Sequence, residues 1–266
     1  MKNKNRFPIS VILMFAIAIG LLGFSTVGGA RAVLTSFSDE YDSEFTMNNI
    51  GITLNEHPNY GDGTPVAHRN YGSGTDGKWD GTGEKEVALL DWYKDEVKVG
   101  SGIKEGLSIT NTGSIDEYVR LVLYVSWWQK DDSGNLVKMT DLDPSLIKVE
   151  VENDVNWKTD TKYSTDERTI LYYTQLLPGK ADGKVYSTEQ VKLNIFIDPK
   201  VKEYIRSETV EKRGNVTVIT TEFAYDGATI KVEAEAHGVQ GHNAVDAIKS
   251  AWGRDVKVEN DILSLS

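Results

Sequence analysis

The sequence predicts an all-β protein, a jelly-roll-like antiparallel β-sandwich with a short C-terminal helix and long surface loops. Three observations lead to this prediction. Segments rich in β-branched and aromatic residues recur along the chain with turn-forming residues between them. Residues 118–128, YVRLVLYVSWW, are apolar on both alternating faces, which is typical of a strand in the middle of a sandwich. Residues 243–253 carry the clearest helix signal after residue 32.

Further strands follow from alternating or continuous apolar patterns. They are predicted at residues 50–56, 86–92, 106–113, 145–152, 168–177, 189–197, 215–225 and 228–236. A turn centred on Asp-Ser-Gly-Asn, within residues 129–139, predicts a hairpin after the central strand. Asp226-Gly227 is the strongest short hairpin signal, and it predicts that the last two strands pair with each other.

Two segments lack a strand pattern. Residues 57–85 are glycine-rich, polar and without periodicity, and we interpret them as an exposed insertion in the sandwich domain. Residues 198–214 follow another pattern, since three apolar residues at helical spacing predict a short surface helix: Val201, Tyr204 and Ile205.

The C-terminal helix signal can be assigned residue by residue. Asn243 is expected to cap the helix by accepting a hydrogen bond from a backbone N–H of the first turn. Gly253 is expected to end it in a left-handed conformation. A helix of about nine residues is not stable alone in water. We therefore expect Ile248 and Trp252 to hold it against the sandwich, where it would act as a plug that closes one end.

Residues 1–32 have the pattern of a secretory signal peptide. Basic residues are followed by a 16-residue apolar run at 9–24 and by Ala30-Arg31-Ala32, which fits a small-x-small cleavage site. The alternative is a retained membrane anchor, but the run is shorter than the roughly 20 residues that span a bilayer. Cleavage after Ala32 gives a chain that starts at Val33 and a secreted or extracellular location. Membrane contact is expected only through the uncleaved segment.

Charge and cysteine usage exclude several classes of partner and framework. The whole chain has a net charge of −11, and residues 33–266, with 25 basic and 40 acidic residues, have −15. Such a surface repels the phosphates of nucleic acids, so no nucleic acid partner is expected. The chain has no cysteine, which rules out a disulfide framework and lipid attachment through cysteine.

No catalytic residue can be assigned, because the common protease, hydrolase and nucleotide-binding motifs are absent from the sequence. His237 and His242 are weak candidates for zinc, and Asp131 and Asp132 for calcium, but neither pair has the spacing of a known site. Turn formation is the favoured explanation for these residues. No cofactor is therefore predicted, with calcium and zinc as the open alternatives. Trp79, in the polar stretch, is the candidate platform for stacking a sugar.

Several motifs occur together in an order that resembles one group of exported proteins. These motifs are GGARAVLTSF (28–37), TNTGSIDEYVRL (110–121), DPSLIKVEVENDVNW (143–157), ERTILYYTQLLPG (167–179) and VQGHNAVDAIKSAWG (239–253). They resemble proteins with a SipW-type signal peptide, the group that includes the TasA matrix-fibre proteins and camelysin.

The resemblance implies a jelly-roll domain, a SipW-type signal peptidase as partner, and a structural role in the biofilm matrix of a Gram-positive surface. It also implies that residues 33–46 can complete the sheet of a neighbouring subunit, giving a homo-polymer or contacts with other matrix proteins. Val33, Leu34 and Phe37 are the apolar anchors of that segment. The jelly-roll domain would then span residues 47–256, followed by a tail at 257–266.

Two alternative functions stay open at the level of sequence. Camelysin carries a metalloprotease label, so one alternative is a camelysin-like surface metalloendopeptidase. The other is a carbohydrate-binding surface module, for which Trp79 is the candidate residue.

Overall fold

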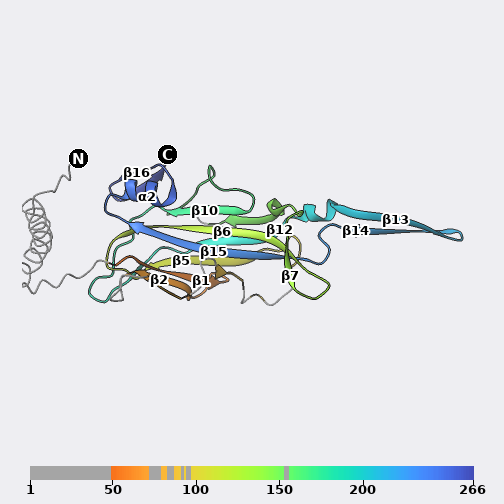
Figure 1. Cartoon of the computed structure of the whole chain (residues 1–266), viewed down its shortest axis with the longest axis horizontal. Coiled ribbons are helices and arrows are strands. Elements are labelled where there is room, and N and C mark those ends of the chain that lie inside the picture. Colours follow the sequence, from red (N-terminus) through yellow and green to blue (C-terminus); the bar gives the residue numbers. More distant parts are fainter. Residues whose placement is uncertain (1–48, 72–78, 83–86, 91–92, 94–96, 153–155) are drawn as a thin grey trace, which may run out of the picture. The chain divides into compact units, whose positions relative to one another are not determined.

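The computed structural model describes residues 49–71, 79–82, 87–90, 93, 97–152 and 156–266, and only the backbone of residues 69–71, 79–82 and 87 (Figure 1). The predicted signal peptide lies outside the described residues, as do its cleavage site at Ala30 and Ala32 and the assembly anchors Val33, Leu34 and Phe37.

The first of two main sheets is antiparallel throughout and has β5 near its centre. The strand order is β3-β2-β1-β5-β12-β8, with β11 also paired to β5. The strands are β3 (Trp79–Thr82), β2 (Thr64–Tyr71), β1 (Gly51–Pro58), β5 (Ile103–Asn111), β12 (Val191–Ile197), β8 (Ile147–Val151) and β11 (Tyr186–Ser187). A short 3-10 helix, η1 (Pro144–Leu146), leads into β8.

The second main sheet is built around β6 (Glu117–Lys130), the strand predicted at the centre of the sandwich. Its order is β4-β15-β6-β10-β9, and β7 pairs with the end of β6 in the predicted hairpin. The other strands are β4 (Val87–Ala88), β15 (Ala228–Gln240), β10 (Arg168–Tyr173), β9 (Trp157–Thr159) and β7 (Leu136–Met139).

The main core lies between these two sheets. β6 contributes the alternate residues Val119, Leu121, Leu123, Val125 and Trp127, which pack with Leu107 and Ile109 of β5 and with Leu193 and Ile195 of β12. Alternation along each strand places these side chains on the inner face. The predicted class, an all-β antiparallel sandwich with a short C-terminal helix, is confirmed.

A second apolar cluster covers the outer face of the β6 sheet. Helix α2 (Ala244–Trp252) packs there, beside a hairpin of β16 (Val256–Glu259) and β17 (Ile262–Leu265) (Figure 1). Ile248 is fully buried against the outward-facing side chains of β6 and β10. The helix was expected to close an end of the sandwich, and it lies instead on an outer face. Residues 257–266, predicted as a tail, form most of the hairpin.

The helix limits agree with the sequence, but one cap does not. Gly253 ends α2 in the left-handed region, with φ of 66°. Asn243 occupies the N-cap position, yet it is itself left-handed, with φ of 51°, and its side chain makes no capping hydrogen bond. In that backbone conformation Asn243 serves the sharp turn after β15, a role for which Asn is well suited.

Residues 205–223 form a separate ribbon, which we call the arm. β13 (Ile205–Arg213) and β14 (Val216–Phe223) pair only with each other within the described chain (Figure 1). The predicted helix in 198–214 is wrong beyond a single turn, because η2 (Pro199–Glu203) is followed directly by β13. The hairpin predicted at Asp226-Gly227 is also wrong, since β15 pairs with β6 over its whole length.

Residues 57–85 were expected to be an exposed insertion, and the structure places strands in them. β2 pairs with β1, and β3 pairs with β2, so this stretch extends the first sheet at its edge. The described side chains of β2, at residues 64–68, are exposed or half-buried, which accounts for the missing apolar signal. No helix among the described residues is long and apolar enough to cross a membrane.

Candidate functional site

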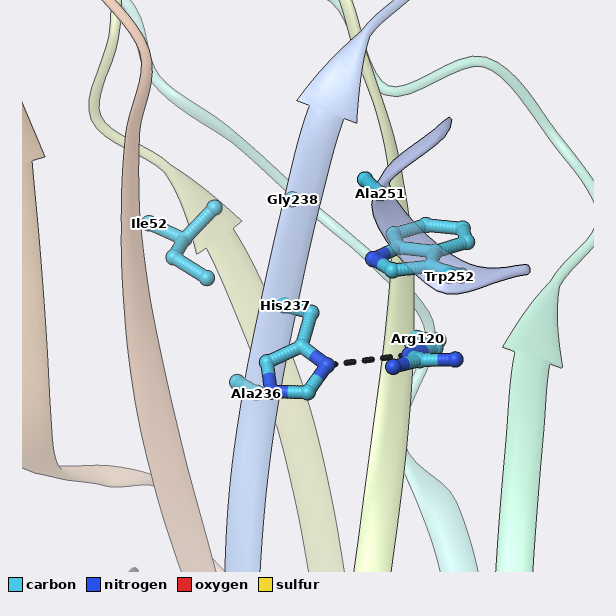
Figure 2. Close-up of a pocket in the computed structure, with 7 residues that line it drawn as sticks. All are labelled: Ile52, Arg120, Ala236, His237, Gly238, Ala251 and Trp252. Carbon is cyan, nitrogen blue, oxygen red and sulfur yellow. Dashed lines mark hydrogen bonds between the residues drawn. The ribbon is translucent and has the colours of Figure 1, made fainter. Parts of the chain in front are cut away.

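A pocket of about 230 Å³ opens where β15, β6 and the end of α2 meet (Figure 2). A second pocket of about 240 Å³ adjoins it along the outer face of the sheet and shares Arg120, His237 and Trp252 with it. The first pocket is lined by Ile52, Arg120, Ala236, His237, Gly238, Ala251 and Trp252.

Strand register brings the polar residues of this site together. His237 of β15 lies directly opposite Arg120 of β6, and Arg120 lies opposite Tyr172 of β10. Directly opposed residues on one face of antiparallel strands have side chains in contact. A row of His237, Arg120 and Tyr172 therefore crosses three strands beside the helix.

Hydrogen bonds fix the imidazole of His237. Arg120 Nε donates to His237 Nδ1 at 2.9 Å (Figure 2), and His237 Nε2 lies 2.7 Å from Glu235 Oε1. Because a guanidinium nitrogen can only donate, Nδ1 accepts, and the ring proton sits on Nε2 facing Glu235. Both ring nitrogens are thus engaged within the protein, which leaves no lone pair directed at a metal ion.

Two aromatic residues, Trp252 and Tyr172, contact the guanidinium of Arg120. Its Cζ lies 4.8 Å from the ring centre of Trp252, and its Nη1 donates to the Tyr172 hydroxyl at 3.3 Å. Trp252 and Tyr172 meet edge to face, with ring centres 5.5 Å apart. Cation–π and edge-to-face contacts of this kind attach the end of α2 to the sheet.

The adjoining pocket combines cationic and carboxylate groups. Arg168 Nε is buried and makes no hydrogen bond within the described residues, while Glu235 accepts from the Tyr124 hydroxyl at 3.3 Å. Arg254, also in its lining, pairs with Asp160. This chemistry suits the holding of a small polar group. The lining residues of the two pockets include no serine or threonine hydroxyl that could serve as a nucleophile.

The structure does not bring the predicted metal candidates together. His242 is exposed in the turn before α2, and it lines a different hollow, with Ile50 and Asp116. Across the part of the chain that the structure describes, no three His, Cys, Asp or Glu side chains converge as a metal site.

Asp131 and Asp132 lie in the exposed turn between β6 and β7. Asp131 Oδ1 accepts from the backbone N–H of Asn135 at 2.8 Å and of Ser133 at 2.9 Å. These backbone hydrogen bonds, that of Asn135 foremost, hold the pKa of Asp131 below its ordinary value. Asp131 therefore organises the hairpin turn, as Asp residues commonly do. Trp79 begins β3, and its side chain lies outside the described residues.

Sequence reasoning did not identify Glu117, a fully buried carboxyl group at the start of β6. Its Oε1 accepts from the Gly51 N–H at 2.9 Å, whereas Oε2 is buried with no hydrogen-bond partner in the described chain. Burial raises the pKa of Glu117 from its ordinary 4.5 to about 8, although the Gly51 bond opposes the rise. A Cβ at Gly238 would lie 2.4 Å from Oε2, so a side chain at position 238 would displace the Glu117 carboxyl group. An acidic residue opening an otherwise apolar strand was the only signal.

Comparison with known proteins gives no relative. No protein-family model, no curated protein and no solved structure matches the chain. The function is therefore inferred from the chain's own residues and from the edges and surfaces that its fold leaves open.

Proposed function

We propose that the chain is a secreted, non-catalytic structural protein of the cell surface or extracellular matrix, and that its subunits assemble by strand addition. The observation that supports this most is the outer edge of β15. On one side β15 pairs with β6 through all thirteen of its residues. On the other side, within the described chain, it pairs with β4 only at Glu233 and Ala234, next to a hydrogen bond from Leu89 N to Val232 O.

An edge of this kind can receive a further strand. Open N–H and C=O groups along a strand edge are a template for an extended segment, and hollows beside such an edge select its side chains. The pocket lined by Ile52, Ala236 and Gly238 borders residues 236–238 of β15. It is of a size that admits one apolar anchor from an added strand.

Residues 33–46 are the proposed donor, with Val33, Leu34 and Phe37 as anchors. Removal of the signal peptide after Ala32 would free this segment, so a SipW-type signal peptidase is the proposed processing partner. Strand addition then joins copies of the chain, or joins it to other matrix proteins, after export.

The test compares the chain that starts at Val33 with the chain that starts at Met47. We expect filaments by electron microscopy and large particles by light scattering only for the longer chain. Phe37→Asp should abolish assembly because it removes an anchor, whereas Ser38→Asp adds the same charge one position on and should retain it. Equal behaviour of the Val33 and Met47 chains, or of the two Asp variants, would count against strand addition by this segment.

A further inference from the structure

The arm exposes apolar side chains that nothing in the described chain covers. All nine residues of β13 are exposed, and Val210 and Ile219, directly opposite each other, have exposed fractions of 59% and 60%. A two-stranded hairpin without a packed face is marginally stable in water. A surface of this kind is expected to be covered by a partner.

The charges of the arm differ from those of the rest of the protein. The whole chain has a net charge of −11, but residues 205–223 hold three basic and three acidic side chains. Arg206 pairs with Glu222, and Arg213 pairs with Glu211. Glu208 and Lys212 make no ion pair among the described residues. Because the arm is neutral, two acidic copies can approach along it with little repulsion.

The backbone of β13 offers a defined edge. Gly214 and Asn215 form a two-residue turn, with Gly214 at φ of 63°, as the tight hairpin turns require. Such a turn closes on the hydrogen-bonded pair Arg213 and Val216, and hydrogen-bonded pairs then alternate along the ribbon. The N–H and C=O groups of Glu208, Val210 and Lys212 consequently point away from β14, toward the outer edge of β13.

Only one register lets two copies of this edge pair well. A residue whose N–H and C=O groups point to the outer edge must lie opposite a residue of the same kind in the second copy. Three antiparallel registers meet this condition and pair seven or more of the nine residues of β13. One of them sets Glu208 against its own copy, and another sets Arg206 against Lys212; like charges directly opposite are destabilising. The third sets Val210 against Val210 and Glu208 against Lys212, twice by symmetry.

We propose that the arm joins two copies of this chain, edge to edge along β13, about a two-fold axis through Val210. The joined arms form a four-stranded sheet. An apolar row then crosses the sheet, formed by Ile219 and Val210 of one copy and by Val210 and Ile219 of the second copy. Two Glu208–Lys212 pairs flank this row. The opposite charges fix the register, as cross-strand pairs do. This contact is separate from the β15 edge and needs neither residues 33–46 nor strand addition.

Cysteine cross-linking tests the axis, because the chain has no cysteine of its own. A hydrogen-bonded antiparallel pair has Cα atoms about 5.5 Å apart, within the span of a disulfide. Val210→Cys should therefore form disulfide-linked dimers under mild oxidation at least tenfold faster than Ile219→Cys. Ile219 is equally exposed, but its copy would lie three strand spacings away, about 14 Å. Equal rates, or faster linkage through Ile219→Cys, would overturn pairing along β13.

Charge reversal tests the register in the chain that starts at Val33 and in the chain that starts at Met47. Glu208→Lys and Lys212→Glu should each raise the dimer dissociation constant at least tenfold in sedimentation experiments, and the double variant should restore it to within threefold. Glu259→Lys makes the same charge change as Glu208→Lys at an exposed position of β16 and should leave the dissociation constant unchanged. A monomer at all concentrations, or no rescue in the double variant, refutes the arm dimer. If strand addition by residues 33–46 fails instead, the chain that starts at Val33 and the chain that starts at Met47 assemble alike, and the arm dimer is unaffected.

Discussion

Two hairpins lie outside the main sheets, and they differ in whether their apolar side chains are buried. The β16–β17 hairpin, with strands of four residues each, buries Val256 and Leu263 against the outer face of the β6 sheet. The β13–β14 arm has longer strands and buries no residue. Short strands suffice where a hairpin is packed, and long strands do not replace packing. The packed hairpin stabilises the copy of the chain that contains it. The arm leaves its apolar side chains exposed, where a second copy of the chain can cover them.

Contacts beyond the strands reinforce that difference. Arg254 precedes β16, and its side chain is nearly fully buried with Asp160, the Nε to Oδ2 distance being 2.6 Å. Its Nη1 also donates to the backbone oxygens of Asp255 and Ser266, which ties both ends of the hairpin together. The arm ion pairs are surface pairs, which contribute little to stability.

The largest expected effect is loss of the packed region through Ile248→Asp. Ile248 is fully buried between α2 and the sheet, so the change removes apolar contacts and buries a charge without a partner. We expect the free energy of unfolding to fall by about 4 kcal/mol or more in denaturant titration. Val245→Asp, on the exposed side of the same helix, is the control and should change it by less than about 0.5 kcal/mol. Equal stability of the two variants would mean that α2 does not dock through Ile248.

A smaller loss is expected from Arg254→Met. Asp160 is then left buried and uncompensated, which lowers the free energy of unfolding by about 3 kcal/mol at neutral pH. The double variant with Asp160→Asn removes the unpaired charge and should recover at least half of the loss in thermal unfolding. A double variant no more stable than Arg254→Met would show that the backbone contacts of Arg254, and not its ion pair, hold the hairpin.

Sequence patterns predicted an element well where the element's own residues determine its structure. β6 is apolar on both faces because it is central, and α2 begins after Asn243 and ends before Gly253, as the sequence indicated, although Asn243 does not cap it. Pairing between distant segments could not be read in this way. Asp226-Gly227 has the chemistry of a hairpin turn, but β14 is taken by β13, and β15 is taken by β6.

The site shows the same limit. His237 and His242 were linked by their short separation in sequence, whereas the residues that contact His237 are Arg120 and Glu235, brought to it by strand register and by alternation along β15. The β16–β17 hairpin was missed for a different reason. Its turn residues, Asn260 and Asp261, both have positive φ, as a type I′ turn requires, but four-residue strands at a chain end resemble an irregular tail.

The smallest effect is expected from removal of the arm. Replacing residues 206–222 with two glycines deletes no buried side chain, and the backbone hydrogen bond from Ala224 N to Tyr204 O closes the base. The free energy of unfolding of the monomer should change by less than about 1 kcal/mol, because only exposed residues are lost. A chain that ends at Asp255, and so lacks the other hairpin, is the matched comparison and should unfold at far lower denaturant concentration, since it loses buried Val256 and Leu263. If the armless chain were destabilised as strongly, the arm would be part of the fold of a single copy and not a surface for a second one.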